Sequence, residues 1–304
     1  MSHRTRVWIA LSTVYVIWGS TYLGIKLAGE TIPPLFAVST RFIAAGLLMA
    51  AVAFWRRGSR AFHLTWPELR AAALVGVLLP GANALLFIAE RHVATGLSSL
   101  IIGAVPLWVV LLRTATGDRP PTRALAGVAA GFGGLVLLVR PSGGAPLWGL
   151  LLVVASSATW ATGAFLSSRL PLPTDAFTAA SIEMLVGGAL LLPIGLATTH
   201  PHFAAFSARS IGGWIYLVTF GSLVGYTAFT WLLDNAPLGR VATYAYVNPV
   251  VAIALGAIVL HESLTWTIGA GAVLVLVCVA VVVRTESVPR VAEHAQPVPM
   301  TEGP

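Results

Sequence analysis

The chain of 304 residues is 57% apolar and only 10% charged, and its mean hydropathy is +0.86. Soluble domains carry about a quarter charged residues, so the composition excludes an ordinary soluble protein and predicts a membrane protein. The formal net charge of +7 would suggest nucleic acid as a partner in a soluble protein. In this chain it has a topological cause, described below, so we expect no nucleic acid partner. The single cysteine, Cys278, excludes an intrachain disulfide.

Ten apolar segments follow one another, each near the length of about 20 residues that crosses the hydrocarbon core. The first has a basic start, as a signal peptide would, but no small-residue cleavage site follows it. We therefore expect it to stay as an uncleaved helix. The polar, proline-rich tail 285–304 is expected to be disordered. The expected spans are 7–27, 35–55, 69–89, 93–115 and 122–139 in the first half, and 147–168, 176–198, 211–233, 241–260 and 265–283 in the second.

The placement of basic residues tests this span count. If the N-terminus is cytoplasmic, 13 of the 18 lysines and arginines lie in cytoplasmic segments, four lie outside and Arg41 lies within a span. Such a bias orients membrane helices, so we predict that both termini are cytoplasmic. The four outside are Lys26, Arg91, Arg140 and Arg209. The inside set is Arg4, Arg6, Arg56, Arg57, Arg60, Arg70, Arg113, Arg119, Arg123, Arg169, Arg240, Arg284 and Arg290.

The two halves of the chain repeat each other. An offset of 142 residues places Trp18 on Trp160, Ser20 on Thr162, Ser39 on Ser181 and Gly46 on Gly188. An offset of 143 places Asn83 on Tyr226, Gly96 on Gly239, Pro106 on Pro249 and Thr122 on Thr265. Five spans per copy is an odd number, so the second copy enters the membrane from the opposite side. The expected fold is an all-α membrane protein of ten transmembrane helices in two inverted five-helix repeats, over 7–139 and 147–283.

The stretch RVATYAYVNPVVAIALGAIVL, residues 240–260, combines a spanning length with a polar face. Tyr244 and Asn248 are four residues apart and share one face of the helix. Pro249 frees a backbone carbonyl, which in a membrane needs a neighbouring helix or a water-lined cavity. The pattern is typical of a helix that lines a cavity, and the alternative is a kinked packing helix. The matched Pro106 predicts a second helix break, and we expect both prolines to take part in gating.

Five segments carry a resemblance to a known family: WGSTYLGIK (18–26), STRFIAAG (39–46), VPLW (105–108), TYAYVNPVVAIALG (243–256) and HESLT (261–265). They resemble the EamA family of the drug/metabolite transporter superfamily, in its branch of bacterial inner-membrane exporters. The resemblance implies two five-helix repeats and export of small organic metabolites without ATP hydrolysis. It also implies a central cavity among helices one, three and four of each half. The family usually has a glutamate in the first-half loop, where this chain reads GDRP and Asp118 takes its place; Glu262 fills the second-half slot.

Matched polar and aromatic residues inside the spans are the candidates for substrate contact. Trp18 and Trp160 precede small or hydroxyl residues, Thr21 among them, and could line a cavity or wedge two helices. Asn83 and Tyr226 are the polar members of otherwise apolar helices. A buried amide needs a hydrogen-bond partner, which a neighbouring helix or a substrate could supply. The predicted substrate-binding residues are Trp18, Thr21, Asn83, Trp160, Tyr226, Tyr244 and Asn248.

Arg41 and Glu183 occupy equivalent positions in the two copies with opposite charges. Ionisable groups within a span are costly and usually face the protein interior. Two interpretations stay open: a buried tether between the halves, or a gating pair coupled to an ion such as a proton. We expect mutual dependence of the two residues in either case.

Several function classes lack their motifs. The sequence has no Walker phosphate loop, no HExxH zinc motif and no GxSxG elbow, so we expect no ATP drive, no metal, no cofactor and no enzymatic activity. The predicted function is a secondary transporter that exports small organic metabolites from the bacterial inner membrane. A passive channel or facilitator is the main alternative, and a membrane-embedded enzyme is a more distant one.

Overall fold

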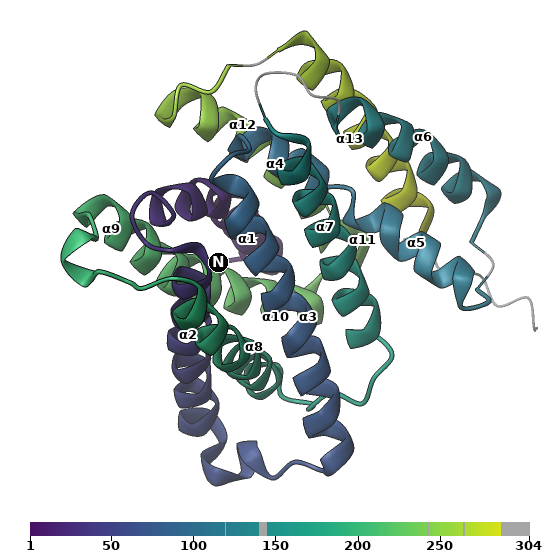
Figure 1. Ribbon diagram of the computed structural model, residues 1–304. Helices are drawn as coiled ribbons and strands as arrows, with labels where there is room; N and C mark the ends of the chain where they lie inside the picture. The colour runs from purple at the N-terminus through teal and green to yellow at the C-terminus, as the bar shows by residue number, and fades with distance from the viewer. Residues whose placement is uncertain (119, 140–144, 237, 242, 264, 287–304) are drawn as a thin grey trace, which may run out of the picture.

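The computed structural model describes residues 1–118, 120–139, 145–236, 238–241, 243–263 and 265–286, and its regular structure there is entirely helical (Figure 1). The predicted disordered tail therefore lies outside the described residues from position 287 onward. The helices are α1 (His3–Ala28), α2 (Pro34–Arg57), α3 (Trp66–Glu90), α4 (Thr95–Ile102), α5 (Val105–Ala115), α6 (Thr122–Val139), α7 (Leu147–Ser167), α8 (Ala176–Thr198), α9 (Ala208–Tyr216), α10 (Gly225–Asn235), α11 (Leu238–Val241), α12 (Tyr244–Val259) and α13 (Trp266–Glu286). Two 3₁₀ turns (Gly58–Phe62 and Phe203–Ala205) and a π-helix (Leu217–Val224) complete the list.

These elements form ten membrane spans, five in each half of the chain. Seven helical segments are long and apolar enough to cross a membrane: α1, α2, α3, α4 with α5, α7, α8, and α9 with the π-helix and α10. Three shorter apolar helices, α6, α12 and α13, complete the set of ten. The predicted number and order of spans are confirmed.

The two repeats are inverted, and their packing shows this directly. Helices α2 and α8 hold equivalent places in the two halves and pack against each other. Along this contact Gly195 lies against Leu35, and Gly188 against Ile43. Residue numbers rise on one helix as they fall on the other, so the pair is antiparallel.

The fifth helices of the two halves, α6 and α13, repeat this arrangement. Gly134 lies against Leu274, and Gly271 lies against Leu138. Small residues at both crossings let the helix backbones approach closely, as is usual in lipid. Figure 1 shows this pair at one edge of the bundle.

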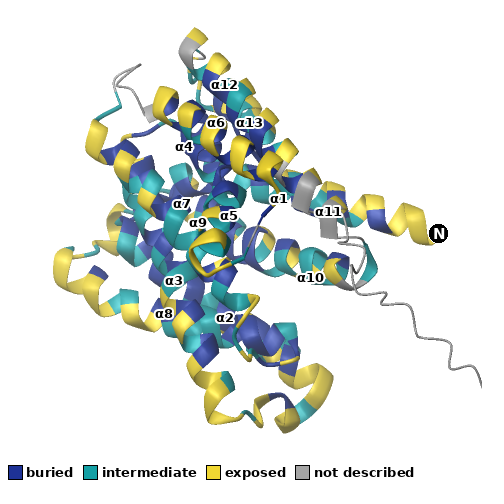
Figure 2. Ribbon diagram, turned by 90° about the vertical axis from the view of Figure 1, so that its right-hand side faces the viewer, coloured by how far each residue is buried: buried dark blue, intermediate teal, exposed yellow. Residues whose placement is uncertain are grey.

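Exposed tryptophans mark the two ends of the spans. Trp55 and Trp66 are exposed on either side of the α2–α3 connection, and Trp148 and Trp266 are exposed at the starts of α7 and α13. The start of α7 lies beside the end of α3, because Gly149 packs against Val93. Trp148 is therefore at the opposite end from Trp66, as expected for aromatic belts at two membrane surfaces. Figure 2 shows buried residues on inward helix faces and exposed ones around the outside.

The fourth and eighth of the ten spans depart from the continuous helices that we expect from the sequence. We call the spans helix one to helix ten in chain order, to keep them apart from the labels α1 to α13. Helix four is divided into α4 and α5 at Gly103 and Ala104, and Pro106 is the second residue of α5. Helix eight contains the π-helix Leu217–Val224 between α9 and α10. The break expected at Pro249 is not found there, since α12 continues through that proline. Pro249 is the sixth residue of α12, past the first four N–H groups that lack helical partners, so the helix continues through it with one backbone hydrogen bond fewer.

Candidate functional site

A central cavity of about 1100 Å³, including its open mouth, lies between the repeats. All the predicted site residues except Glu183 line it, although they are spread over more than 200 positions of the chain. The role of these residues in substrate binding stays a prediction. The predicted members are Trp18, Thr21, Arg41, Asn83, Pro106, Trp160, Tyr226, Tyr244, Asn248 and Pro249.

Trp18 both lines the cavity and joins helices. Its ring packs edge-on against Tyr244, with 5.2 Å between the ring centroids, and lies 4.9 Å from the ring of Phe229. Its indole nitrogen donates to the carbonyl of Gly221 in the π-helix at 3.3 Å. The two interpretations of this residue, cavity wall and wedge, therefore apply together. These contacts fix the orientation of a large aromatic face, which suits recognition of apolar groups.

Asn248 ties α12 to α1 from within the cavity wall. With its amide nitrogen oriented toward acceptors, the nitrogen lies 3.3 Å from the carbonyl of Tyr15 and 3.3 Å from that of Tyr244. The side-chain nitrogen thus has partners in the protein. In that orientation the amide oxygen is the atom of Asn248 left to accept a hydrogen bond from a bound molecule.

The two matched prolines free backbone carbonyls at the cavity. A proline cannot donate to the carbonyl four residues before it, which is Ile102 for Pro106 and Ala245 for Pro249. Both Ile102 and Ala245 line the cavity. The cavity is therefore bordered by two residues whose carbonyls lack the usual N–H donor four residues later, as we expect for irregular backbone at membrane depth.

Asn83 and Tyr226 have protein partners. The amide of Asn83 donates to the carbonyl of Leu79 in its own helix at 3.1 Å. The hydroxyl of Tyr226 donates to the carbonyl of Ala176 at 3.3 Å. These bonds satisfy part of each polar group and leave acceptor capacity facing the cavity.

Several lining residues were not among the sequence-based candidates. They include Tyr22, Phe42, Met184, Gly221 and Ser222. Phe42 and Met184 follow Arg41 and Glu183 directly, which is the signal that points to them. Ser222 belongs to the π-helix, whose side-chain directions an α-helical pattern does not predict.

Arg41 and Glu183 have different surroundings despite their equivalent positions. Arg41 is 6% exposed and lines the cavity, and its Nη2 lies 3.5 Å from the hydroxyl of Ser222. The backbone of Glu183 packs against Gly76 of α3. Within the described part of the chain these two side chains form no ion pair. The buried tether, one of the two interpretations of this pair, is thus not formed directly in this structure.

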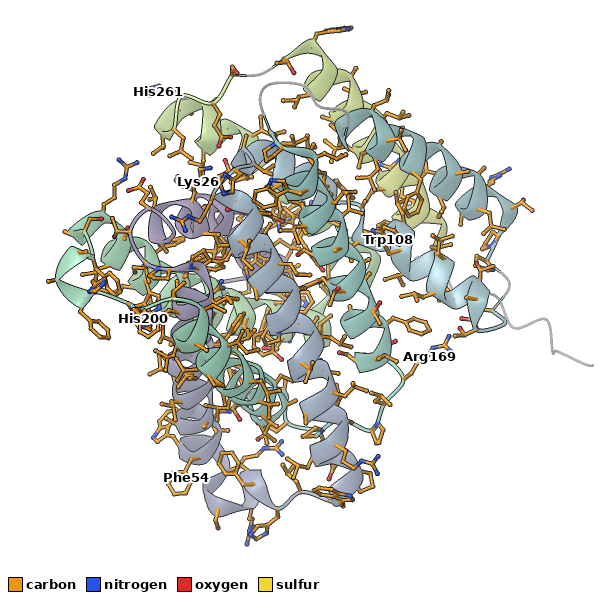
Figure 3. The ribbon with its side chains drawn as sticks, in the orientation of Figure 1. Lys26, Phe54, Trp108, Arg169, His200 and His261 are labelled. Carbon is orange, nitrogen blue, oxygen red and sulfur yellow. The ribbon has the colours of Figure 1, made fainter. Side chains whose placement is uncertain are left out.

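Two carboxylates outside the cavity hold the ends of the spans. Glu262, after α12, accepts from the backbone N–H of Thr95 at 2.8 Å, from the Thr95 hydroxyl at 2.9 Å and from the N–H of Gly96 at 3.2 Å. Asp118, after α5, accepts from Arg113 Nε at 3.0 Å and from Arg169 Nη2 at 2.8 Å. His261, which precedes Glu262, and Arg169, which binds Asp118, lie on opposite sides of the bundle (Figure 3).

The hydrogen bond from Arg113, with the charge and hydrogen bond of Arg169, lowers the pKa of the Asp118 carboxyl below its usual value. Asp118 is therefore ionised at neutral pH and fits the glutamate slot expected from the sequence. Among the residues described, no group of three or more histidine, cysteine or acidic side chains is placed to hold a metal ion.

Comparison with known proteins adds a family assignment to this geometry. The EamA-like transporter family matches the chain twice, over residues 6–140 and 147–284. A solved crystal structure with 20% sequence identity aligns with a TM-score of 0.63 and covers 92% of this chain and 96% of its own. At that identity the likeness shows a shared fold.

Curated relatives match over most of their length. The "Uncharacterized inner membrane transporter YedA" of Escherichia coli (strain K12) is 35% identical over 256 residues, which are 81% of this chain and 80% of the relative. The "Probable amino-acid metabolite efflux pump" of the same strain is 28% identical over 282 residues, 86% of this chain and 90% of the relative. An "Uncharacterized transporter" of Archaeoglobus fulgidus is 28% identical over 255 residues, 82% of this chain and 86% of the relative.

Proposed function

We propose that this chain, which belongs to the EamA-like transporter family, exports small organic metabolites from the bacterial inner membrane by alternating access. The chain is a multi-pass membrane transporter with a small-molecule substrate, and family membership places it among transporters rather than enzymes. The observation that carries the proposal is the central cavity, to which equivalent residues of both inverted repeats contribute. Two similar halves of opposite orientation can exchange shapes around a fixed centre, which supplies alternating access.

The cavity wall supports a small amphiphile as the substrate class. Trp18, Trp160 and Phe42 supply aromatic surface, while Tyr244 and Asn248 supply hydrogen-bonding groups. The space of about 200 Å³ that the cavity encloses in this conformation suits a small organic molecule and not a large one. One relative carries the name of an amino-acid metabolite efflux pump, and amino acids and their analogues fit the same description.

Three further parts of the proposal concern organisation and drive. We place the functional repeats at 7–139 and 147–283, and both termini in the cytoplasm, from the bias of basic residues. A coupling ion such as a proton would drive export. A passive facilitator is the alternative, and uphill accumulation of a compound in sealed vesicles excludes it.

The experiment has two stages. An overexpressing strain is first grown against a panel of amino acids, analogues and dyes to identify an exported compound. Efflux of that compound is then measured for Asn248→Ala. We expect efflux to fall by at least about fivefold with unchanged expression, because the variant loses a hydrogen bond worth about 1 kcal/mol and a contact that positions α12.

Ser98→Ala is the matched control. Ser98 is a buried polar residue of α4 that is not part of the cavity wall, so its replacement should leave efflux unchanged. Normal export by both Asn248→Ala and Tyr244→Phe would place the binding site elsewhere. Turnover of a compound in detergent without a gradient would favour an enzyme.

A further inference from the structure

Arg41 is a buried cation whose hydrogen-bonding capacity is mostly unused. Its side chain carries five N–H donors. Nη2 lies 3.5 Å from the Ser222 hydroxyl, at the limit of a hydrogen bond, while Nε and Nη1 are buried and have no partner among the described residues. The guanidinium also lies 5.0 Å from the ring of Phe42, which gives it aromatic contact on one side. No part of this environment neutralises the charge.

The described acidic side chains contact groups other than Arg41. Asp118 binds Arg113 and Arg169, Asp175 lies 3.4 Å from Arg57, and Glu262 binds the start of α4. Glu90 lines a separate cavity beside Lys26. Glu183 forms no ion pair with Arg41 within the residues described. Among the described residues, Arg41 thus has no carboxylate partner in the conformation seen here.

An uncompensated charge at membrane depth is costly, so an arginine kept there normally has an anionic partner. Arg41 lines the central cavity, and a bound molecule is the partner that can reach it there. Either edge of the guanidinium, Nε with Nη2 or Nη1 with Nη2, offers two parallel donors. That fork matches the two oxygens of a carboxylate.

We propose that the transported molecule carries one carboxylate, which binds the guanidinium of Arg41, and an apolar group that packs on the aromatic wall. This inference rests on the proposed function and names the substrate class: amphiphilic monocarboxylates, including amino acids with apolar side chains. Among the described lining residues Arg41 alone carries a formal charge. One cation balances a monoanion and not a phosphate dianion. Trp18 and Trp160 line the same cavity and provide the apolar surface.

The test uses the purified full chain in detergent and three probes of one shape: 3-phenylpropanoate, 3-phenylpropanol and 3-phenylpropylamine. Dissociation constants come from titration calorimetry or ligand-dependent thermal shift. We expect the carboxylate to bind roughly 10- to 100-fold more tightly than the alcohol, as for hydrogen bonds to a charged group. Arg41→Gln should remove this preference, and Arg41→Lys should retain part of it, because lysine keeps the charge without the fork.

Arg209→Gln is the matched control. It removes one positive charge from an exposed ion pair with Glu30, neither residue being part of the cavity wall, and should leave the preference unchanged. The wild-type comparison needs no variant, so it remains decisive even if Arg41→Gln folds poorly. Binding of the alcohol or the amine as tightly as the carboxylate overturns the proposal.

The transport assay separates this inference from the proposed function. Export of a compound without an anionic group, at equal rates by the wild type and Arg41→Gln, overturns the role of Arg41 while export itself stands. A carboxylate preference in detergent, combined with no export of any compound in the panel, supports the Arg41 site and contradicts the proposed function.

Discussion

The two ends of the central bundle are held by carboxylates in different ways. Glu262 follows helix nine of the second repeat and binds the first two residues of α4 in the first repeat, so its bonds cross between the repeats. Asp118 follows helix four and binds two arginine side chains, Arg113 in its own repeat and Arg169 after α7. Carboxylates in the equivalent loops of the two repeats therefore make unequal contacts.

The difference lies in what the carboxylates bind. Backbone N–H groups at a helix start are fixed donors with a partial positive charge, so Glu262 binds a rigid target. Partly exposed arginine side chains, such as those that bind Asp118, lose conformational entropy when they pair, and water screens them. We infer that the repeats are firmly closed at the Glu262 end, which we predict to face outward. The conformational change of alternating access would have to break the Glu262 contact. The Asp118 contact could persist, or break and form again at a small cost in free energy.

The largest expected effect is that of Glu262→Ala. The change leaves the N–H groups of Thr95 and Gly96 and the Thr95 hydroxyl without their acceptor, and Thr95 is fully buried. We expect the free energy of unfolding in mixed micelles to fall by about 2–4 kcal/mol. Glu30→Gln, at an exposed ion pair, is the control and should change it little. Equal losses for the two variants would remove the distinction between a buried contact and a surface one.

Gly256→Ala should break the same contact while both Glu262 and Thr95 are kept. A Cβ atom at Gly256 would lie 2.5 Å from Glu262 Oε2 and 2.7 Å from Thr95 Oγ1, so the carboxylate would have to move away from α4. We expect a loss of about 1–3 kcal/mol, as for overpacking. A thermal unfolding midpoint measured in detergent checks this.

Gly133→Ala supplies the matched control for that change, since a Cβ atom there meets no other atom within 4 Å. It should be neutral or slightly stabilising, because alanine favours helix more than glycine does. A Gly256→Ala protein as stable as Gly133→Ala would show that the Glu262 contact contributes little.

The smallest expected effect is that of Asp118→Asn, because the carboxylate of Asp118 is partly exposed. The folded protein lowers the pKa of Asp118 through Arg113 and Arg169, so the contact favours folding above the unfolded pKa, about 3.9 for Asp, and this contribution is lost as pH falls through the folded value. Unfolding midpoints of wild type and variant should differ slightly at pH 7 and converge below pH 4. A difference that grows on acidification would contradict the assignment.

Much of the architecture could be predicted because it follows from residue type and spacing. Apolar length gave the ten spans, and rare residues in register, such as Trp18 with Trp160, revealed the repeat. Polar side chains inside apolar helices need a hydrogen-bond partner or a cavity, because an unpaired polar group is costly in lipid. Asn248 and Tyr244 therefore indicated the cavity that the structure contains.

The remainder depends on contacts between distant segments. Glu262 and Thr95 meet because helices four and nine occupy their places in the fold, and no local pattern in either segment indicates the other. Arg41 and Glu183 matched in sequence, and their helices do adjoin, but the side chains have separate surroundings. A direct pair could not be decided from spacing because side-chain direction within a tight helix crossing is set by packing.

The π-helix Leu217–Val224 gives a physical meaning to the one-residue change of offset between the repeats. The helix-capping residues Thr65 and Ser207, which start helices three and eight, are 142 positions apart, while the lining residues Asn83 and Tyr226 are 143 apart. Helix eight therefore contains one more residue than helix three between its start and the cavity. A π turn accommodates an extra residue by bulging, without turning the rest of the helix by the roughly 100° that one α-helical residue occupies. The bulge thus preserves the direction of Tyr226 after an insertion, and removing one residue from it would convert helix eight into a continuous α-helix like its counterpart.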